Sequence, residues 1–149
     1  MLPIKALRLS VGELLVADVA FLAAVLANKI ALVTNSFTPN ENLTFADFTL
    51  AVFTGSTPKA AVAGTQQAGI DPNTGAQTIT ILAPAGGWRW ECTVAPGAPV
   101  VVTGFILTDN AGAVLLGMQQ LTSTVTISAI GDFIDLGKVE MQVVSRPLS

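Results

Sequence analysis

Side chains that could carry acid–base or nucleophilic chemistry are scarce in this 149-residue sequence. It contains no histidine and no tyrosine, which removes the commonest general base and the usual zinc ligand. Its one cysteine, Cys92, has no activating neighbour except Arg89, and strand alternation places that residue on the opposite face. We therefore expect Cys92 to be a small buried core residue, and a single cysteine excludes an internal disulfide.

Acidic residues are the remaining catalytic option. Asp132, Asp135 and Glu140 form the densest group, and a calcium site could use them, but their spacing does not indicate two carboxylates opposed across a cleft. Residues 71–75 (DPNTG) resemble an oxygen-rich metal loop but lack its further acidic ligands and terminal glutamate. We expect turns at both places, with no metal, no cofactor and no catalytic residue, and hence a chain that is not an enzyme.

Residues 86–91 (GGWRWE) are the most distinctive local motif. Trp88 and Trp90 fall on one face of an expected strand, beside Arg89 and Glu91 on the other. The two indoles could form a sugar-stacking platform, as in a lectin. Alternatively they are large anchors of a β-sandwich core or of a subunit contact, because aromatic side chains dominate both. We expect the anchoring role.

The composition indicates a chain that covers much of its surface with partners. Half of it is hydrophobic (51%) and 11% is charged, whereas soluble domains carry about 25% charged residues. The longest apolar run, 11–33, is divided by Glu13, Asp18 and Lys29, so it is unlike a membrane span of about 20 apolar residues or a signal peptide. The seven basic residues are scattered and the net charge is −3, which argues against nucleic acid. We expect burial against other subunits, without membrane or nucleic-acid contact.

From residue 28 onward the pattern is β. Period-two alternation and turn residues predict a half-buried antiparallel sheet folded as a β-sandwich, with a jelly roll as one form of it. Turns are expected at 71–75, at 84–87 and at 108–112, where Asn110 and Gly112 are suited to positive φ. A long loop is expected over 54–76. The expected strands are 28–35, 47–53, 77–83, 87–94, 99–107, 112–118, 123–128 and 137–144, with a short piece at 132–136.

Residues 1–27 are expected to form an N-terminal arm or short helix outside a sandwich domain of residues 28–149. Ser10 and Glu13 have the spacing of a capping box, although Gly12 lowers the helix propensity. An arm that becomes ordered only against a neighbour fits equally well. The candidate interaction residues are Leu14, Leu15, Phe21 and Leu22 in this arm, together with the tryptophan pair.

Several segments resemble a family of small, mostly uncharacterised phage and prophage virion structural proteins. The likeness is carried by 28–33 (NKIALV), 37–39 (FTP), 42–48 (NLTFADF), 55–58 (GSTP) and 104–116 (GFILTDNAGAVLL). The resemblance implies a virion component, assembled in the host cytoplasm, and supplies no catalytic residues.

Within that family the leading hypothesis is a capsid decoration (cement) protein. Such a protein would bind the major capsid protein and associate with itself, as a homotrimer by analogy with decoration proteins. The alternative is a tail, fibre or head-fibre component that binds a host surface glycan through Trp88 and Trp90.

Overall fold

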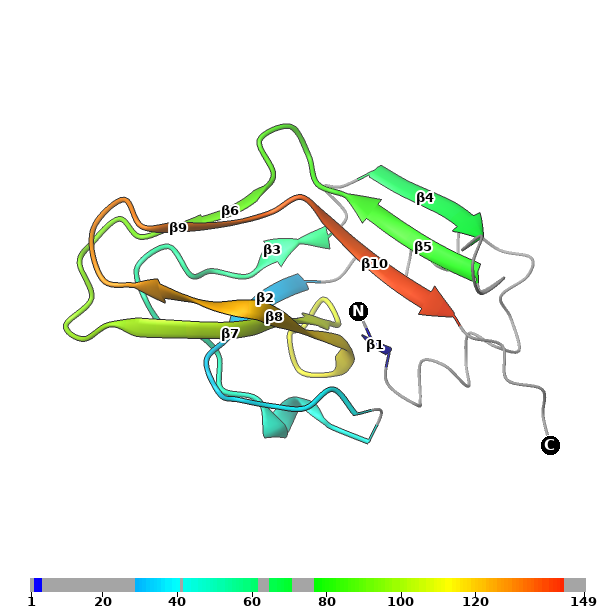
Figure 1. Ribbon diagram of the computed structural model, residues 1–149, viewed down its shortest axis with the longest axis horizontal. Helices are drawn as coiled ribbons and strands as arrows, with labels where there is room; N and C mark the ends of the chain where they lie inside the picture. Colours follow the sequence, from blue (N-terminus) through cyan, green and yellow to red (C-terminus); the bar gives the residue numbers. More distant parts are fainter. Residues whose placement is uncertain (1, 4–28, 41, 62–64, 71–76, 144–149) are drawn as a thin grey trace.

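The computed structural model describes residues 2–3, 29–40, 42–61, 65–70 and 77–143. In these residues the chain is mainly β with antiparallel sheets, which confirms the expected sandwich (Figure 1). The jelly-roll form stays a prediction. The elements are β1 (Leu2–Pro3), β2 (Lys29–Val33), a 3-10 helix (Phe45–Asp47), β3 (Lys59–Ala60), β4 (Thr65–Ile70), β5 (Gln77–Leu82), β6 (Trp88–Glu91), β7 (Val100–Thr108), β8 (Leu115–Ile127), β9 (Phe133–Leu136) and β10 (Lys138–Val143).

The first layer is a five-stranded sheet in the order β1-β8-β7-β2-β3. Its central strand, β7, is buried from Val102 to Thr108 because apolar clusters cover both of its faces. Phe105 and Leu107 belong to the core between the layers, whereas Ile106 belongs to a second cluster with Phe48. A strand buried on both faces is apolar at most successive positions, and this explains the composition of residues 100–107 (VVVTGFIL). Thr103 is the polar exception, and its hydroxyl lies within hydrogen-bond distance of Asn35 O (2.7 Å).

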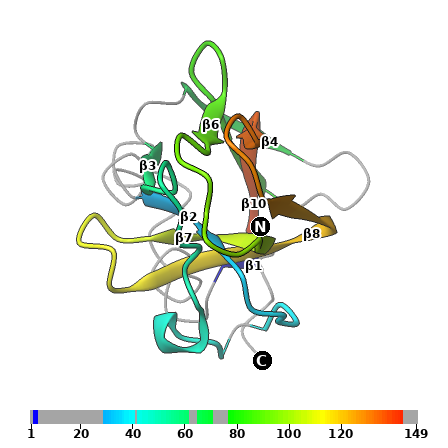
Figure 2. The same cartoon turned by 90° about the vertical axis from the view of Figure 1, so that its left-hand side faces the viewer.

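In the second layer, β9 and β10 follow one another along one long stretch of chain. β6 pairs with β9, and β5 pairs with β10. Trp88 pairs with Leu136 and Leu82 pairs with Lys138, so the turn 83–87 is looped out between two parts of the ladder. Hydrogen bonds from Ala83 N to Gly137 O (2.8 Å) and from Gly87 N to Pro84 O (2.8 Å) close this turn. Figure 2 shows β6 standing above the sheet that contains β7 and β2.

The expected strand at 47–53 is wrong. Phe48, Ala51 and Phe53 are buried, but Phe48 is out of phase with the other two, and the backbone makes only an isolated bridge between Val33 and Leu50. Hydrogen bonds of the Asn35 side chain replace part of the backbone pairing of a strand. Its Nδ2 donates to Asp47 O (2.9 Å), and its Oδ1 accepts from Thr49 N (2.7 Å).

Two other boundaries differ from expectation. The strands expected at 112–118 and 123–128 are parts of one strand, β8, with an irregularity where Val102 pairs with Val125 and Gly104 pairs with Gln120. The loop expected over 54–76 contains β3 and β4. Both errors arose where the sequence is polar or small, so that backbone pairing rather than an apolar face defines the strand.

The expected turns at 84–87 and 108–112 are present. Gly86, Gly87 and Gly112 have positive φ, as these turns require, but Asn110 does not. The turn expected at 71–75 and the capping box at Ser10 lie outside the described residues. So does the expected arm or helix of residues 1–27, except that Leu2–Pro3 pairs with β8.

Candidate interaction surface

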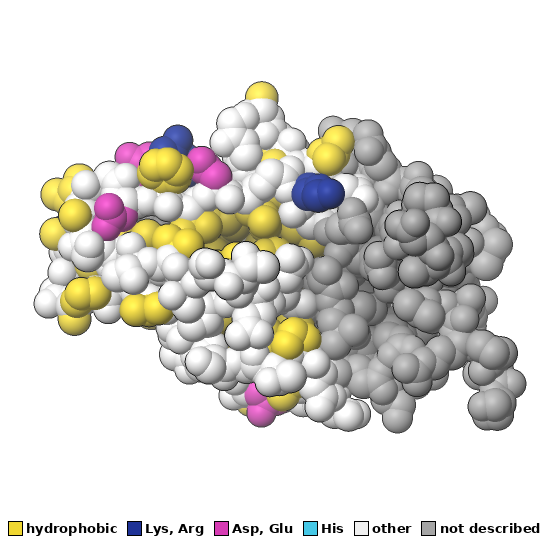
Figure 3. All heavy atoms as spheres, in the orientation of Figure 1, with side chains coloured by type: hydrophobic (Ala, Val, Ile, Leu, Met, Phe, Trp, Pro, Cys, Tyr) yellow, Lys and Arg dark blue, Asp and Glu magenta, His cyan; other side chains and the backbone are white. Residues whose placement is uncertain are grey.

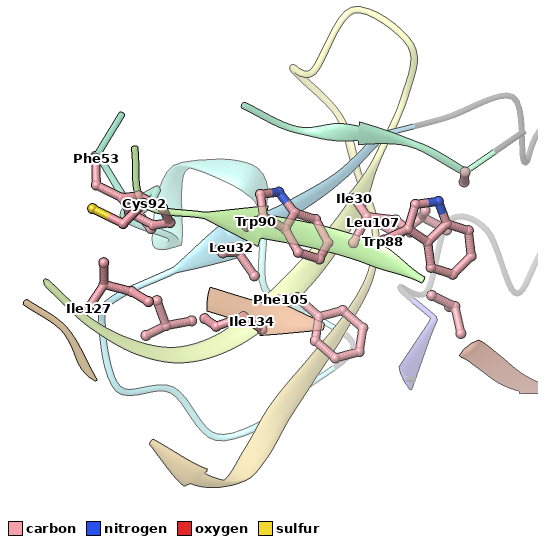
Figure 4. Packing of buried hydrophobic residues seen from close by; sticks show 14 residues of the cluster. Ile30, Leu32, Phe53, Trp88, Trp90, Cys92, Phe105, Leu107, Ile127 and Ile134 are labelled. Atoms are coloured by element: carbon pink, nitrogen blue, oxygen red, sulfur yellow. The ribbon is translucent and has the colours of Figure 1, made fainter. Parts of the chain in front are cut away.

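The tryptophan pair lies inside the molecule. Trp88 and Trp90 are 3% and 0% exposed, and they share a core cluster with Leu32, Phe105 and Leu107 of the first layer (Figure 4). Each indole N–H donates to a backbone carbonyl, from Trp88 to Ala60 O at 3.2 Å and from Trp90 to Thr57 O at 3.0 Å. Both polar atoms of the rings are thus satisfied in the core. In this fold the two rings anchor the core of the sandwich, and neither is exposed for stacking on a sugar or for a contact with another subunit.

Cys92 is also buried, as expected from the alternation of the same strand. Its Sγ lies 3.1 Å from the carbonyl oxygen of Val94, to which the thiol donates. Arg89 points to the outer face of β6. The thiol of Cys92, directly after β6, therefore lies within the core, and Arg89 lies on the opposite side of that strand.

The acidic residues Asp132, Asp135 and Glu140 do not form one site in the described structure. Asp132 accepts hydrogen bonds from Ser128 N (2.7 Å) and Ala129 N (2.8 Å). These donors lower the pKa of the Asp132 carboxyl, because they stabilise its charged form. Asp135 lies 3.8 Å from Arg89 across the strand pair, and the side chain of Glu140 is outside the described set. Among the described residues no group of three such side chains could hold a metal ion.

The outer face of β6 and β9 carries a small charged group around an exposed ring. Arg89 lies 3.3 Å from Glu91, and its guanidinium stacks 3.7 Å from the ring centroid of Phe133. Phe133 is 47% exposed. Because the three charged side chains are also about half exposed, solvent screens their attraction and they contribute little to stability.

A larger exposed apolar surface lies at the end of the sandwich where the chain passes between layers. Residues 92–99 pass from β6 to β7, and residues 128–132 pass from β8 to β9. Hydrogen bonds join the two crossings, from Cys92 N to Asp132 O (2.8 Å) and from Gly131 N to Cys92 O (2.9 Å). Thr93 N donates to Thr54 O (3.0 Å), which brings the segment 50–54 to the same end.

We call this surface the apolar end, defined by four exposed side chains. They are Val52 (80% exposed), Val94 (56%), Val101 (41%) and Ile130 (68%). Ala95, Ala98, Pro99 and Ala129 are exposed beside them. Figure 3 shows hydrophobic side chains gathered at the end of the molecule farthest from the grey residues.

The apolar end also lacks charge over long stretches of chain. Residues 92–108 and 110–131 contain no Lys, Arg, Asp or Glu, and neither do residues 48–58. Exposed apolar patches of this kind are typical of interaction surfaces, and Asp132 is the acidic residue nearest to Ile130 in the sequence. The sequence analysis missed this surface. The signal was present in residues 93–101 (TVAPGAPVV), where apolar residues lie in a turn-rich segment.

The other expected contact residues are not placed. Leu14, Leu15, Phe21 and Leu22 lie outside the described residues. In the part of the chain that is described, no helix is long and apolar enough to cross a membrane. The chain matches no known protein family, no curated protein and no solved structure. The candidate interaction surface is therefore described by its geometry alone.

Proposed function

We propose that this chain is a bacteriophage virion structural protein that decorates the capsid and stabilises the head shell. The apolar end is the observation that carries the proposal. It presents Val52 and Ile130 on segments that backbone hydrogen bonds hold together, so a partner meets a surface that is already formed. Preorganisation of this kind reduces the entropy lost on binding.

The disposition of polar groups supports a role in assembly. Asp109 and Asp132 accept backbone hydrogen bonds within turns, and Arg89 is paired with acidic neighbours. Trp88 and Trp90 are committed to the core. These groups take part in the structure of the domain itself, and among the described residues the apolar end is the surface that we propose for contact. The resemblance of segments in residues 28–116 to phage structural proteins is our reason for proposing a phage particle as the assembly and the major capsid protein as the partner.

Substitution at the apolar end tests the proposal directly. Val52→Asp and Ile130→Asp should each weaken binding to particles that lack this protein by at least about tenfold, roughly 1.4 kcal/mol, because a charge is buried in the contact. Their melting temperatures should not change, since both side chains are exposed. Val114→Asp is the matched control, because Val114 is 52% exposed in the hairpin at the opposite end of β7. Equal binding by all three variants would overturn the role of the apolar end.

Electron microscopy separates the head from the tail. Particles with and without this protein should differ by density on the shell surface. If density disappears from the tail or fibres instead, the chain is a tail or head-fibre component, and the decoration proposal fails.

A further inference from the structure

The outer edge of β8 is free over most of its length among the described residues. On the side away from β7, the two residues of β1 pair with Gly117 and Met118. Beyond them this edge runs from Gln119 to Ile127, where β8 ends, and no described strand pairs with it there. The unpaired backbone N–H and C=O groups of such an edge are a template for another extended chain.

The side chains of this edge do not discourage a second chain. Natural edge strands are often protected by Lys, by other charged residues or by Pro. Residues 119–127 (QQLTSTVTI) contain none of these, and their Thr, Val and Ile favour strands. All the Gln, Thr and Ser side chains in this stretch are exposed. The edge is therefore accessible at the surface of the molecule.

The irregularity in β8 lies at the centre of this stretch. Between the pairs that Gln120 and Val125 make with β7, residues 121–124 of β8 lie opposite a single β7 residue, Thr103. A bulge bends its strand and leaves the extra residues without partners on the neighbouring strand. Residues 121–124 are therefore the part of β8 that has the most backbone donors and acceptors to offer to a second chain.

The free stretch of the edge fits a second copy of itself. An antiparallel pair of identical strands is related by a two-fold axis, and an axis at Ser123 lies at the centre of residues 119–127. Gln119 of one copy then lies opposite Ile127 of the other, so the strand of the second copy ends where β1 begins. One register thus meets both limits of the free stretch.

The same register brings apolar side chains together. Leu121 lies opposite Val125 of the other copy, and each is a half-buried side chain that packs against the core of its own molecule. Figure 3 shows hydrophobic side chains along the gap between the two layers, uncovered on this face. Because a two-fold axis of this kind is perpendicular to the sheet, the inner faces of both copies lie on the same side and these apolar bands join. Residues 110–131 carry no charge, so no like charges meet along the pair.

We propose that two copies of this chain pair through the outer edges of β8, antiparallel and centred on Ser123. The pairing continues the first layer of one molecule into that of the next. It goes beyond the proposed function, because it holds for the isolated protein as well as on a particle. A two-fold contact joins molecules in pairs, in addition to any three-fold contact of a decoration protein.

Disulfide trapping in the full-length protein tests the pairing. Residues directly opposite in an antiparallel pair have Cα atoms about 4.5–5.5 Å apart, within the range of a disulfide, so Ser123→Cys should form a covalent dimer with itself on oxidation. Gln120→Cys is the matched control on the same edge, because its two copies would lie about 20 Å apart along the strands. We expect at least about tenfold more dimer from Ser123→Cys, since pairing raises the local thiol concentration to the millimolar range. The native Cys92 is buried and should stay unreactive.

A mixture of tagged Gln120→Cys and untagged Thr126→Cys tests the register, since these two residues lie opposite one another in it. The mixture should give a covalent heterodimer, whereas neither variant should dimerise alone. If Ser123→Cys dimerises no more than Gln120→Cys does, or if the mixture gives no heterodimer, the proposal is overturned, provided that circular dichroism shows a folded β protein.

Charge placed on the two-fold axis gives a reversible test. Ser123→Lys and Ser123→Glu each set like charges opposite one another, which should weaken pairing by up to about fivefold. A tagged Ser123→Lys chain should therefore retain the Ser123→Glu chain better than an untagged Ser123→Lys chain. Equal retention of the two would contradict the pairing. Particle binding by the Val52→Asp and Ile130→Asp variants tests the proposed function separately, because neither residue belongs to β8.

Discussion

Gly55 lies directly against the backbone of Glu91, so closely that a Cβ atom on Gly55 would be 1.9 Å from the Glu91 carbonyl oxygen. Gly55 also has φ of +112°, a conformation that L side chains rarely adopt. The contact joins the segment 50–57 to the end of β6 and so helps to form the apolar end.

Gly55→Ala should therefore destabilise the protein strongly, by more than about 3 kcal/mol, because overlap adds to backbone strain. Urea denaturation measures the change in unfolding free energy. Gly97→Ala is the control, since an added Cβ there meets nothing within 4 Å and φ is not positive. Equal stability of the two variants would contradict the close approach.

Trp90→Ala should cost about 3–5 kcal/mol of unfolding free energy, as expected for a large aromatic side chain removed from a core. Trp90→Phe should cost less, and part of its effect, about 1–2 kcal/mol, comes from the Thr57 carbonyl left without its donor. Thermal and urea unfolding check both values. If Trp90→Ala left the melting temperature unchanged but abolished glycan binding, the sugar-platform interpretation would replace this one.

Acidification should weaken the fold through Asp132. Backbone hydrogen bonds from Ser128 and Ala129 hold the pKa of this carboxyl below its ordinary value of 3.8. The stabilisation is present above the unfolded-state pKa and is lost as the pH falls through the lower folded-state pKa. The melting temperature of Asp132→Asn should therefore lie below that of the native protein at pH 7, and the gap should shrink below about pH 4. A gap that stays constant with pH would rule this linkage out.

The isolated protein should be a homo-oligomer, because exposed apolar side chains such as Val52 and Ile130 are best covered by closed symmetric contacts. A trimer is the expected state by analogy with decoration proteins. Light scattering at micromolar concentration gives the mass, and a stable monomer there would contradict the prediction.

Alternation was the most informative signal in the sequence. It correctly placed Trp88, Trp90 and Cys92 in the core and Arg89 on the outer face. It failed for β8, because Gln119 and Gln120 are both exposed and so leave no period to detect. Tertiary pairing with β7 defines the strand there, and a local pattern does not contain that information.

The contact surface was harder to predict than the core for a related reason. Val52 and Phe53 are neighbours of similar hydrophobicity, yet Val52 is 80% exposed and Phe53 is 8% exposed. The two side chains differ in the side of the segment to which they point, and the position of this segment in the fold decides which side is buried. Apolar residues in a sequence predict that burial is needed, but they do not say whether this chain or a partner supplies it.

The final prediction concerns the N-terminal residues. Residues 1–27 carry at least eight large apolar side chains, among them Leu7, Leu9, Leu14, Leu15, Val19, Phe21, Leu22 and Val25. Burying each contributes roughly 1.5–3 kcal/mol, enough together to exceed the entropy lost in ordering a few turns of chain. We expect this surface to lie against a neighbouring subunit or the shell, since it would promote aggregation in water.

A chain that begins at Asn28 should therefore keep a β circular-dichroism spectrum but fail to assemble or to bind particles. It also lacks β1, so the edge of β8 loses its partner at Gly117 and Met118. If this shortened chain unfolds, residues 1–27 belong to the core of the sandwich domain, and the arm is not a separate element. If it binds particles as well as the full chain does, the N-terminal residues do not anchor the protein, and the apolar end alone must account for binding.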